Sequence, residues 1–185
     1  MVIATKNPDK ALEMREVLSR VLPGIVFVDD VEWDDVAETG ATLEDNALLK
    51  ARAVAMATGL PALADDTGLE VAALGGAPGV RTARFAGPEA TYAENRAALL
   101  AALDGVDDRR ARFRTVLALV DGEETILASG AVEGSIALAE RGSGGFGYDP
   151  IFEVGGETFA EIGRSGKNTL SHRARALEDL ASRLG

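Results

Sequence analysis

The chain has 185 residues, of which 46% are hydrophobic and 26% are charged, proportions that are ordinary for a globular protein. It has no cysteine and one histidine, His172, which excludes a disulfide framework, a cysteine nucleophile and zinc sites built from cysteines or several histidines. The net charge of −11 opposes binding to the phosphate backbone of a nucleic-acid polymer. A small anion is still compatible with it, because a few basic side chains and a divalent cation can hold one on an acidic body.

The length fits one domain, and we expect it to span residues 1–185. The longest apolar runs, such as 116–120, fall far short of a membrane span of about 18 residues. Residues 1–5 lack the charged segment and the long apolar segment of a signal peptide. We therefore expect a soluble, cytoplasmic protein with no membrane partner.

The first elements predict an alternation of strand and helix. Residues 1–4 favour a short buried strand, and Asn7-Pro8 is typical of a helix N-cap followed by proline at the first helical position. The apolar face of this helix ends before Pro23. Residues 25–28 predict a second strand, so the spacing suggests a βαβ unit.

The next segment predicts a loop, a helix and a strand. Residues 29–40 are acidic and favour a loop, whereas Thr42 is a helix cap and Gly59 a stop signal. Residues 61–66 favour a strand that ends in an acidic tip, followed by a turn at Thr67-Gly68.

The second half predicts a helix, a long hairpin and a final helix. Thr91 and Glu94 form a capping box for a helix that runs to about residue 103. Residues 111–119 and 124–138 favour two long strands joined at Asp121-Gly122, and a glycine-rich loop follows at 142–147. Ser171 opens the last helix. These patterns predict an α/β fold with a mixed sheet.

Two segments in the first half have the composition of a phosphate and metal site. Thr5-Lys6-Asn7-Pro8-Asp9-Lys10 opens a helix, whose free backbone N–H groups attract anions, although capped helices with surface lysines are far commoner than phosphate sites. Asp65-Asp66-Thr67-Gly68 follows a buried run, and Mg²⁺ prefers one or two carboxylates with water and phosphate oxygens. Glu38 is a second candidate carboxylate. The alternative for this segment is an Asp-rich turn.

Two further segments lie late in the chain. Glycines around Phe146 and Tyr148 allow close backbone approach and leave a ring for a planar base to stack on, with Asp149 as acceptor for a base edge; the alternative is a tight loop fixed by core aromatics. Residues 163–169 resemble a P-loop only superficially, because Glu161 and Asn168 break the required spacing. The basic cluster around His172 favours contact with an anion or a base. The alternative is that His172 has a structural role.

The order of these segments resembles the inosine/xanthosine triphosphate pyrophosphatase family, which removes non-standard purine nucleoside triphosphates. The resemblance covers nearly the whole chain. The matching stretches are residues 5–10, 38–47, 64–69, 76–80, 82–87, 145–152 and 171–173. The chain departs from the family's usual residues at Lys6, Leu43, Asp45 and Phe85, and none of these changes removes a charged group.

The resemblance implies an elongated mixed β-sheet with flanking helices, two lobes and a central cleft. It implies Mg²⁺ as cofactor, Glu38 and Asp66 as metal ligands, Asp66 as proton acceptor and a homodimer as assembly. It also implies a set of residues that contact the purine nucleoside triphosphate, among which His172 and Arg173 bind the edge of the base. These are Thr5, Lys6, Asn7, Pro8, Asp9, Lys10, Lys50, Thr67, Phe146, Gly147, Tyr148, Asp149, Lys167, His172 and Arg173.

The expected reaction is hydrolysis of ITP, dITP and XTP to the nucleoside monophosphate and pyrophosphate. Lysines and Mg²⁺ neutralise the charge of the triphosphate while Asp66 accepts a proton from water. Two alternatives remain open. One is a pyrophosphatase for pyrimidine or methylated nucleotides, and the other is a non-catalytic nucleotide-binding module. Glu38 and Asp66 argue against the second, because an anion binder gains nothing from carboxylates without a metal.

Overall fold

The computed structural model describes residues 1–29 and 31–184. In this part of the chain seven strands form one sheet with the order β1-β2-β4-β5-β6-β7, and β3 pairs with β2. The strands are β1 (Val2–Ile3), β2 (Ala62–Val71), β3 (Pro78–Gly79), β4 (Arg110–Asp121), β5 (Glu124–Ile136), β6 (Phe152–Val154) and β7 (Glu157–Thr158). β1 is parallel to β2, whereas β3, β6 and β7 each pair antiparallel, so the predicted mixed α/β fold is confirmed.

The described residues also form five α-helices and fold into two compact units. The helices are α1 (Pro8–Val21), α2 (Leu43–Thr58), α3 (Tyr92–Ala102), α4 (Phe159–Leu170) and α5 (His172–Leu184). The first unit comprises Met1–Asp66, Thr115–Gly130 and His172–Gly185, and the second comprises Thr67–Arg114 and Ala131–Ser171. No helix within residues 1–29 and 31–184 is long and apolar enough to cross a membrane.

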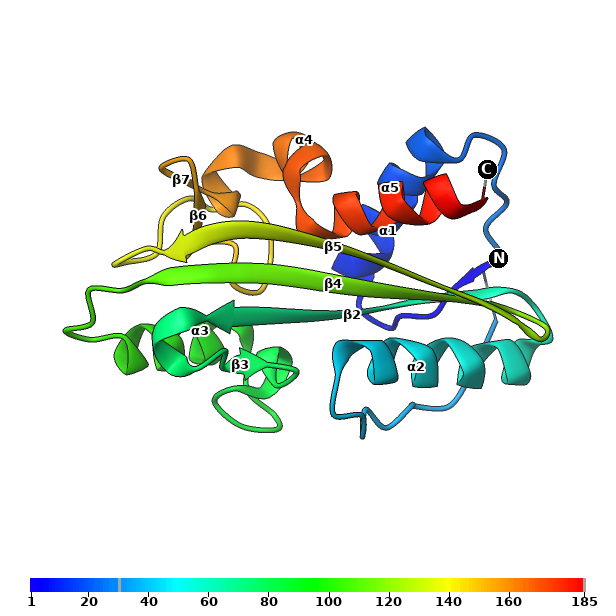
Figure 1. Ribbon diagram of the computed structural model, residues 1–185, viewed down its shortest axis with the longest axis horizontal. Coiled ribbons are helices and arrows are strands. Elements are labelled where there is room, and N and C mark those ends of the chain that lie inside the picture. Colours follow the sequence, from blue (N-terminus) through cyan, green and yellow to red (C-terminus); the bar gives the residue numbers. More distant parts are fainter. Residues whose placement is uncertain (30, 185) are drawn as a thin grey trace. The chain divides into compact units, whose positions relative to one another are not determined.

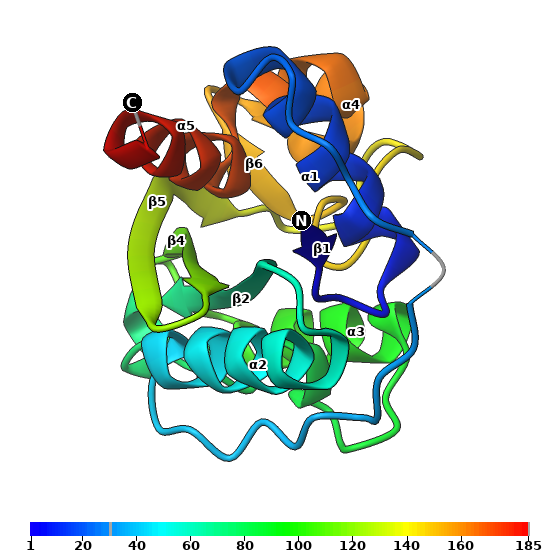
Figure 2. The ribbon, with the colours of Figure 1, turned by 90° about the vertical axis from the view of Figure 1, so that its right-hand side faces the viewer.

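In the first unit, helices cover both faces of the strands. α1 and α5 lie side by side on one face (Figure 1), and α2 lies on the other (Figure 2). The core under α1 and α5 is formed by Met14 and Leu18 of α1, Leu63 of β2, Leu117 of β4 and Leu177 of α5, all fully buried. This packing fixes the starts of α1 and α5, which carry Lys10 and Arg173.

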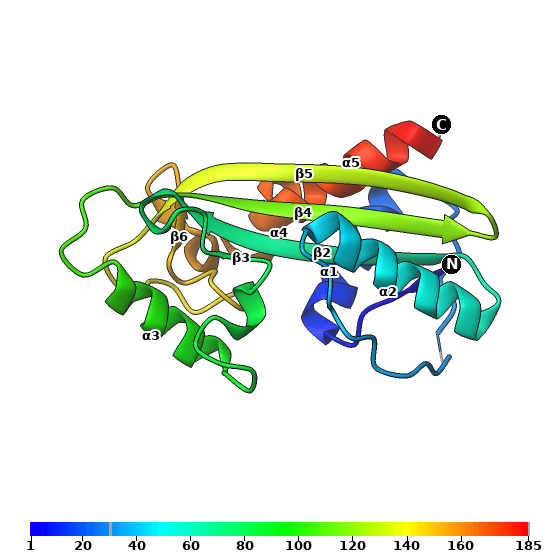
Figure 3. The same ribbon diagram turned by 60° about the horizontal axis from the view of Figure 1, so that its bottom comes forward.

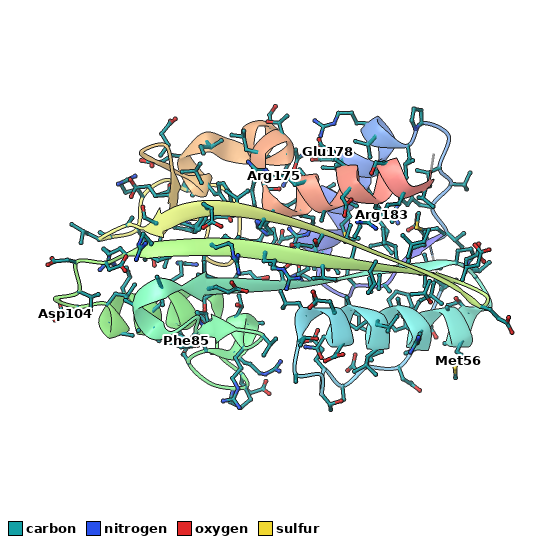
Figure 4. The ribbon with its side chains drawn as sticks, in the orientation of Figure 1. Met56, Phe85, Asp104, Arg175, Glu178 and Arg183 are labelled. Carbon is teal, nitrogen blue, oxygen red and sulfur yellow. The ribbon has the colours of Figure 1, made fainter. Side chains whose placement is uncertain are left out.

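The opposite face of the first unit is covered by small residues of α2. Ala47, Ala51 and Val54 are fully buried, and their spacing of three and four residues places them on one side of the helix. Met56 points away from the strands (Figure 4) and is 88% exposed. The capping box predicted at Thr42 is present, with Asp45 as its partner. The capping box and the buried small residues therefore fix α2 where Asn46 and Lys50 reach Asp66 of β2.

A glycine sets the approach of α5 to the sheet. A side chain on Gly130 of β5 would place its Cβ 2.3 Å from the carbonyl oxygen of His172 and from the backbone nitrogen of Ala176. No side chain fits there, so this glycine lets the first turns of α5 lie directly against β5. The close contact fixes the start of α5, where His172 and Arg173 lie.

The second unit has an aromatic core. The rings of Phe113 and Phe152 are 4.7 Å apart, those of Phe152 and Phe159 are 5.0 Å apart, and Leu99 and Leu103 of α3 belong to the same cluster. Figure 3 shows α3 beside the loop that follows β3. Base binding and core packing were both open for Phe146 and Tyr148 from the sequence. Of these two residues, Tyr148 is buried in this core.

Two local predictions are wrong, and one helix was not predicted. Residues 25–28 form no strand, because their backbone bonds go to Met1 and, from Ile25, back to Leu22, and Val26 is 72% exposed. The turn expected at Thr67-Gly68 is absent, because burial of Leu69 and Val71 continues β2 beyond the acidic pair. The helix α4 was not predicted; Thr158 caps it, and Gly163, with φ of 75°, interrupts it.

Candidate active site

The two adjacent carboxylates of β2 point to opposite faces of the sheet, as successive strand residues must. Asp65 and Asp66 lie in the interior of β2 rather than at its end. Both are buried. Asp65 contacts groups of α1 and α5, whereas Asp66 contacts groups of α2. One Asp-Asp pair therefore supplies two different environments.

Asp65 is held by basic groups. Its Oδ2 atom accepts from Nη2 of Arg173 at 3.1 Å and lies 3.1 Å from Nζ of Lys10. Burial alone raises the pKa of this carboxyl, but the charges of Lys10 and Arg173 outweigh it and hold the pKa of Asp65 well below its ordinary value. Arg173 also donates to Glu13 of α1, and all three members of this ion-pair cluster are buried. Asp65 therefore stays ionised at neutral pH and binds two cations.

Asp66 is held less tightly. Its Oδ2 atom accepts from the amide of Asn46 at 3.1 Å, and its Oδ1 atom accepts from Nζ of Lys50 at 3.3 Å. Burial raises the pKa of Asp66 above its ordinary value, and the charge of Glu38 adds to this effect against the attraction of Lys50. A carboxylate with a raised pKa is a better proton acceptor than an ordinary aspartate.

Lys50 brings the second carboxylate to the same place. Its Nζ atom donates to Oε1 of Glu38 at 2.6 Å as well as to Asp66. Burial lowers the pKa of this ammonium, but the surrounding carboxylates outweigh it and raise the pKa of Lys50 above its ordinary value. Glu38 and Asp66, far apart in sequence, thus share one cation. Their oxygens are the hard ligands that a divalent cation such as Mg²⁺ prefers.

The predicted anion-binding segment begins α1. The Oδ1 atom of Asn7 accepts from the backbone nitrogens of Asp9 and Lys10, so Asn7 is the helix cap and Pro8 occupies the first turn. Lys6 instead pairs with Asp35, and both of these side chains are exposed. The segment therefore has one half-buried cation, Lys10, which pairs with Asp65, and one exposed cation, Lys6.

The candidate base-binding residues lie in the second unit. Asp149 accepts from the backbone nitrogen of Phe146 at 2.8 Å and from Nζ of Lys167 at 2.7 Å. The Lys167 ammonium is 4.3 Å from the centre of the Phe146 ring. The hydroxyl of Tyr148 donates to the carbonyl of Thr82, and burial raises the pKa of Tyr148. Asp149 and Lys167 therefore bind each other and hold the loop around Phe146.

The predicted site residues are divided between the two units. The first unit holds Thr5, Lys6, Asn7, Pro8, Asp9, Lys10, Glu38, Lys50, Asp66, His172 and Arg173, and the second holds Thr67, Phe146, Gly147, Tyr148, Asp149 and Lys167. Sequence reasoning missed Glu13 and Asn46. Glu13 lies three residues after Lys10 on one helix face, a spacing that signals a shared surface, whereas nothing local distinguishes Asn46 as a partner of Asp66.

Comparison with known proteins decides the family. The Ham1 family profile matches residues 1–183, which span both units. The chain belongs to the Ham1 family. A relative from Syntrophobacter fumaroxidans, named dITP/XTP pyrophosphatase, is 49% identical over 97% of this chain and 79% of its own length. A relative of the same name from Porphyromonas gingivalis is 48% identical over 97% of this chain and 94% of its own.

Solved Ham1 structures have the same fold. The HAM1 protein of Coxiella burnetii is 45% identical, with a TM-score of 0.89 over 99% of this chain and 96% of that chain. The Ham1 protein of Staphylococcus aureus is 38% identical, with a TM-score of 0.86 over the same shares. The family predicted from the residue pattern is confirmed, and with it the Ham1 fold over both units.

Proposed function

We propose that this Ham1-family chain is a Mg²⁺-dependent nucleoside-triphosphate pyrophosphatase that converts ITP, dITP and XTP to the nucleoside monophosphate and pyrophosphate, and so cleanses the nucleotide pool. Relatives that share nearly half of its residues carry the name dITP/XTP pyrophosphatase. The observation that carries the proposal is the meeting of Glu38 and Asp66 on the ammonium of Lys50. A buried and a half-buried carboxylate with basic neighbours suit a polyphosphate and its cation.

The residues fit a magnesium ion. Two carboxylates with oxygen atoms on one cation match the ligand set of Mg²⁺, which keeps several waters and uses substrate phosphates for the rest. Glu38 and Asp66 would hold the ion, and it would neutralise charge on the phosphate oxygens.

In the proposed reaction Asp66 accepts a proton from the attacking water. The water oxygen forms a bond to the α-phosphorus, the bond from that phosphorus to the α–β bridging oxygen breaks, and pyrophosphate leaves. Asn46 fixes the Asp66 carboxylate through its amide. The cations Lys10 and Lys50 stabilise the charge that develops on the phosphate oxygens. Burial raises the pKa of Asp66, which favours this carboxylate as the proton acceptor.

We assign base recognition to the loop around Phe146 in the second unit. Phe146 offers a ring for stacking, and the backbone around Gly147 offers hydrogen bonds to a 6-keto purine. An adenine amino group would leave such donors unpaired, which discriminates strongly. His172 and Arg173 as readers of the base edge stay a prediction; Arg173 now binds Asp65 and Glu13, so contact with a base would require one of these bonds to be given up.

The homodimer and the cytoplasmic location also stay predictions. Analytical ultracentrifugation of the full chain at micromolar concentration tests the first, and a sedimentation coefficient near that of a 19.3 kDa monomer contradicts it.

The test of the proposed function is pyrophosphate release from ITP, dITP, XTP, GTP and ATP side by side, with and without Mg²⁺. We expect turnover of the first three in Mg²⁺, much slower turnover of ATP, and loss of activity in a chelator. Preference for pyrimidine or methylated nucleotides would favour a different pyrophosphatase. Binding of ITP without turnover at saturating Mg²⁺ would favour a binding module.

A further inference from the structure

The loop around Phe146 is fixed on one side by a buried ion pair. Asp149 accepts from the Phe146 backbone and from Lys167, and Lys167 and Asp149 are each only 3% exposed. A Cβ on Gly145 would lie 2.1 Å from the Asp149 carboxylate, so the backbone passes directly over this acid. These contacts hold the start of the loop.

A second set of contacts reaches the loop from α3. The Nη1 atom of Arg96 donates to the carbonyl oxygen of Gly147 at 2.9 Å, while its Nε atom donates to Glu140 at 2.8 Å. One turn earlier on the same helix, the ring of Tyr92 lies 6.1 Å from that of Phe146. Residues four apart share one face of a helix, so α3 presents a cation and an aromatic ring to the same loop.

Arg96 is placed to act as a fixed support. Its side chain is only 15% exposed, and its guanidinium has two partners in directions set by the planar group. The N-terminus of α3, which carries Arg96, is capped by the capping box of Thr91 and Glu94. Since helix and side chain are both held, the Gly147 carbonyl is held as well.

The loop needs such a support because of its glycines. Gly145 and Gly147 have φ values of 73° and 60°, in the left-handed region that glycine adopts without strain. Glycine also leaves the free loop many other conformations, and ordering them at the moment of binding costs affinity. A hydrogen bond to Gly147 that is already present before the ligand arrives reduces this cost.

We propose that Arg96 is a positioning residue for purine recognition. Its bond to the Gly147 carbonyl sets the backbone between Phe146 and Tyr148 in advance, so that the Phe146 ring and the neighbouring backbone groups are in place for the base. Arg96 itself contacts no reacting atom. The inference rests on the base-binding role proposed for this loop.

The test compares steady-state dITP hydrolysis by the wild type and by Arg96→Ala. We expect KM to rise about tenfold with kcat within about twofold, because the lost support weakens ground state and transition state alike. Inorganic tripolyphosphate, which has no base, serves as a competitive inhibitor, and its Ki stays within about twofold. A parallel rise of this Ki, a fall in kcat alone or an unchanged KM overturns the proposal.

Matched variants separate the two partners of Arg96. Glu140→Gln removes the ion pair but leaves the bond to Gly147, so its KM is expected within about twofold of wild type. Arg96→Lys keeps one donor and recovers most of the loss. If Arg96→Ala does not fold, Arg96→Gln replaces it with the same expected rise in KM. A lower melting temperature without any change in KM shows a merely structural role and overturns the inference.

A parallel variant distinguishes failure of this inference from failure of the base-binding proposal. Phe146→Ala removes the stacking ring, and we expect its KM for dITP to rise more than tenfold. If Phe146→Ala leaves KM unchanged, the loop does not bind the base and both proposals fall. If Phe146→Ala raises KM and Arg96→Ala does not, the base site stands and the role of Arg96 is wrong.

Discussion

The Nζ atom of Lys50 lies 3.3 Å from Oδ1 of Asp66. Asp66 is the last β2 residue of the first unit, and Lys50 lies in the middle of α2. The same ammonium also donates to Glu38 at 2.6 Å. One half-buried cation therefore holds two carboxylates close together. The arrangement suits a site in which a divalent cation and phosphate oxygens enter together.

Removal of the Lys50 charge is expected to damage catalysis. In Lys50→Met the carboxylates of Glu38 and Asp66 repel each other, and a contact to the substrate phosphates is lost. We expect kcat/KM for dITP to fall by about 100-fold, in the range of other preorganised charged groups. Pyrophosphate release under steady-state conditions measures it. Arg20→Gln removes the same charge from an exposed ion pair with Glu178, and its kcat/KM should stay within about twofold.

The buried cluster of Asp65, Arg173 and Glu13 is expected to dominate the stability of the first unit. In Arg173→Met both acids lose their guanidinium while they stay buried, which is expected to lower the free energy of unfolding by about 3 kcal/mol. Urea denaturation gives this value. Arg183→Met, at an exposed pair with Asp179 on the same helix (Figure 4), should cost less than about 1 kcal/mol. Equal losses for the two variants would contradict the role given to the cluster.

Asp65 also gives stability a defined pH dependence. The pKa of this carboxyl is lower in the folded chain than its ordinary value of 3.8, so the unfolded state binds the proton more tightly. The stabilisation is therefore complete above about pH 4 and is lost progressively as pH falls further. Urea unfolding at several pH values in the presence of a chelator measures the slope. Asp65→Asn should have a smaller slope below pH 4, and an identical slope would show that Asp65 is not the titrating group.

Local hydrogen bonding made much of the fold predictable. Asn7, Thr42 and Thr91 cap helices as their neighbours in sequence require, because a cap involves residues two or three positions apart. The end of the strand after Asp66 was not predictable in this way. β2 continues to Val71 because of burial by distant segments, which no local signal records.

The candidate site was predictable only in its parts. The residue pattern identified Asp65-Asp66, Glu38 and the loop at Phe146 as candidates for the site, and the family resemblance added Lys50. Partners from distant segments were beyond reach: Arg173 binds Glu13 across 160 positions of sequence. The division of the acidic pair between two faces follows from strand geometry, but only once the pair is known to lie inside a strand.

The central claim is that Asp66 accepts the proton of the attacking water, and Asp66→Asn tests it most directly. The measurement is kcat for pyrophosphate release from dITP at saturating substrate and Mg²⁺, with Asp121→Asn, an exposed carboxylate of the first unit, as matched control. We predict a fall in kcat of at least about 100-fold for Asp66→Asn, with the melting temperature nearly unchanged and the control at wild-type rate. A kcat for Asp66→Asn near that of the wild type would contradict the account.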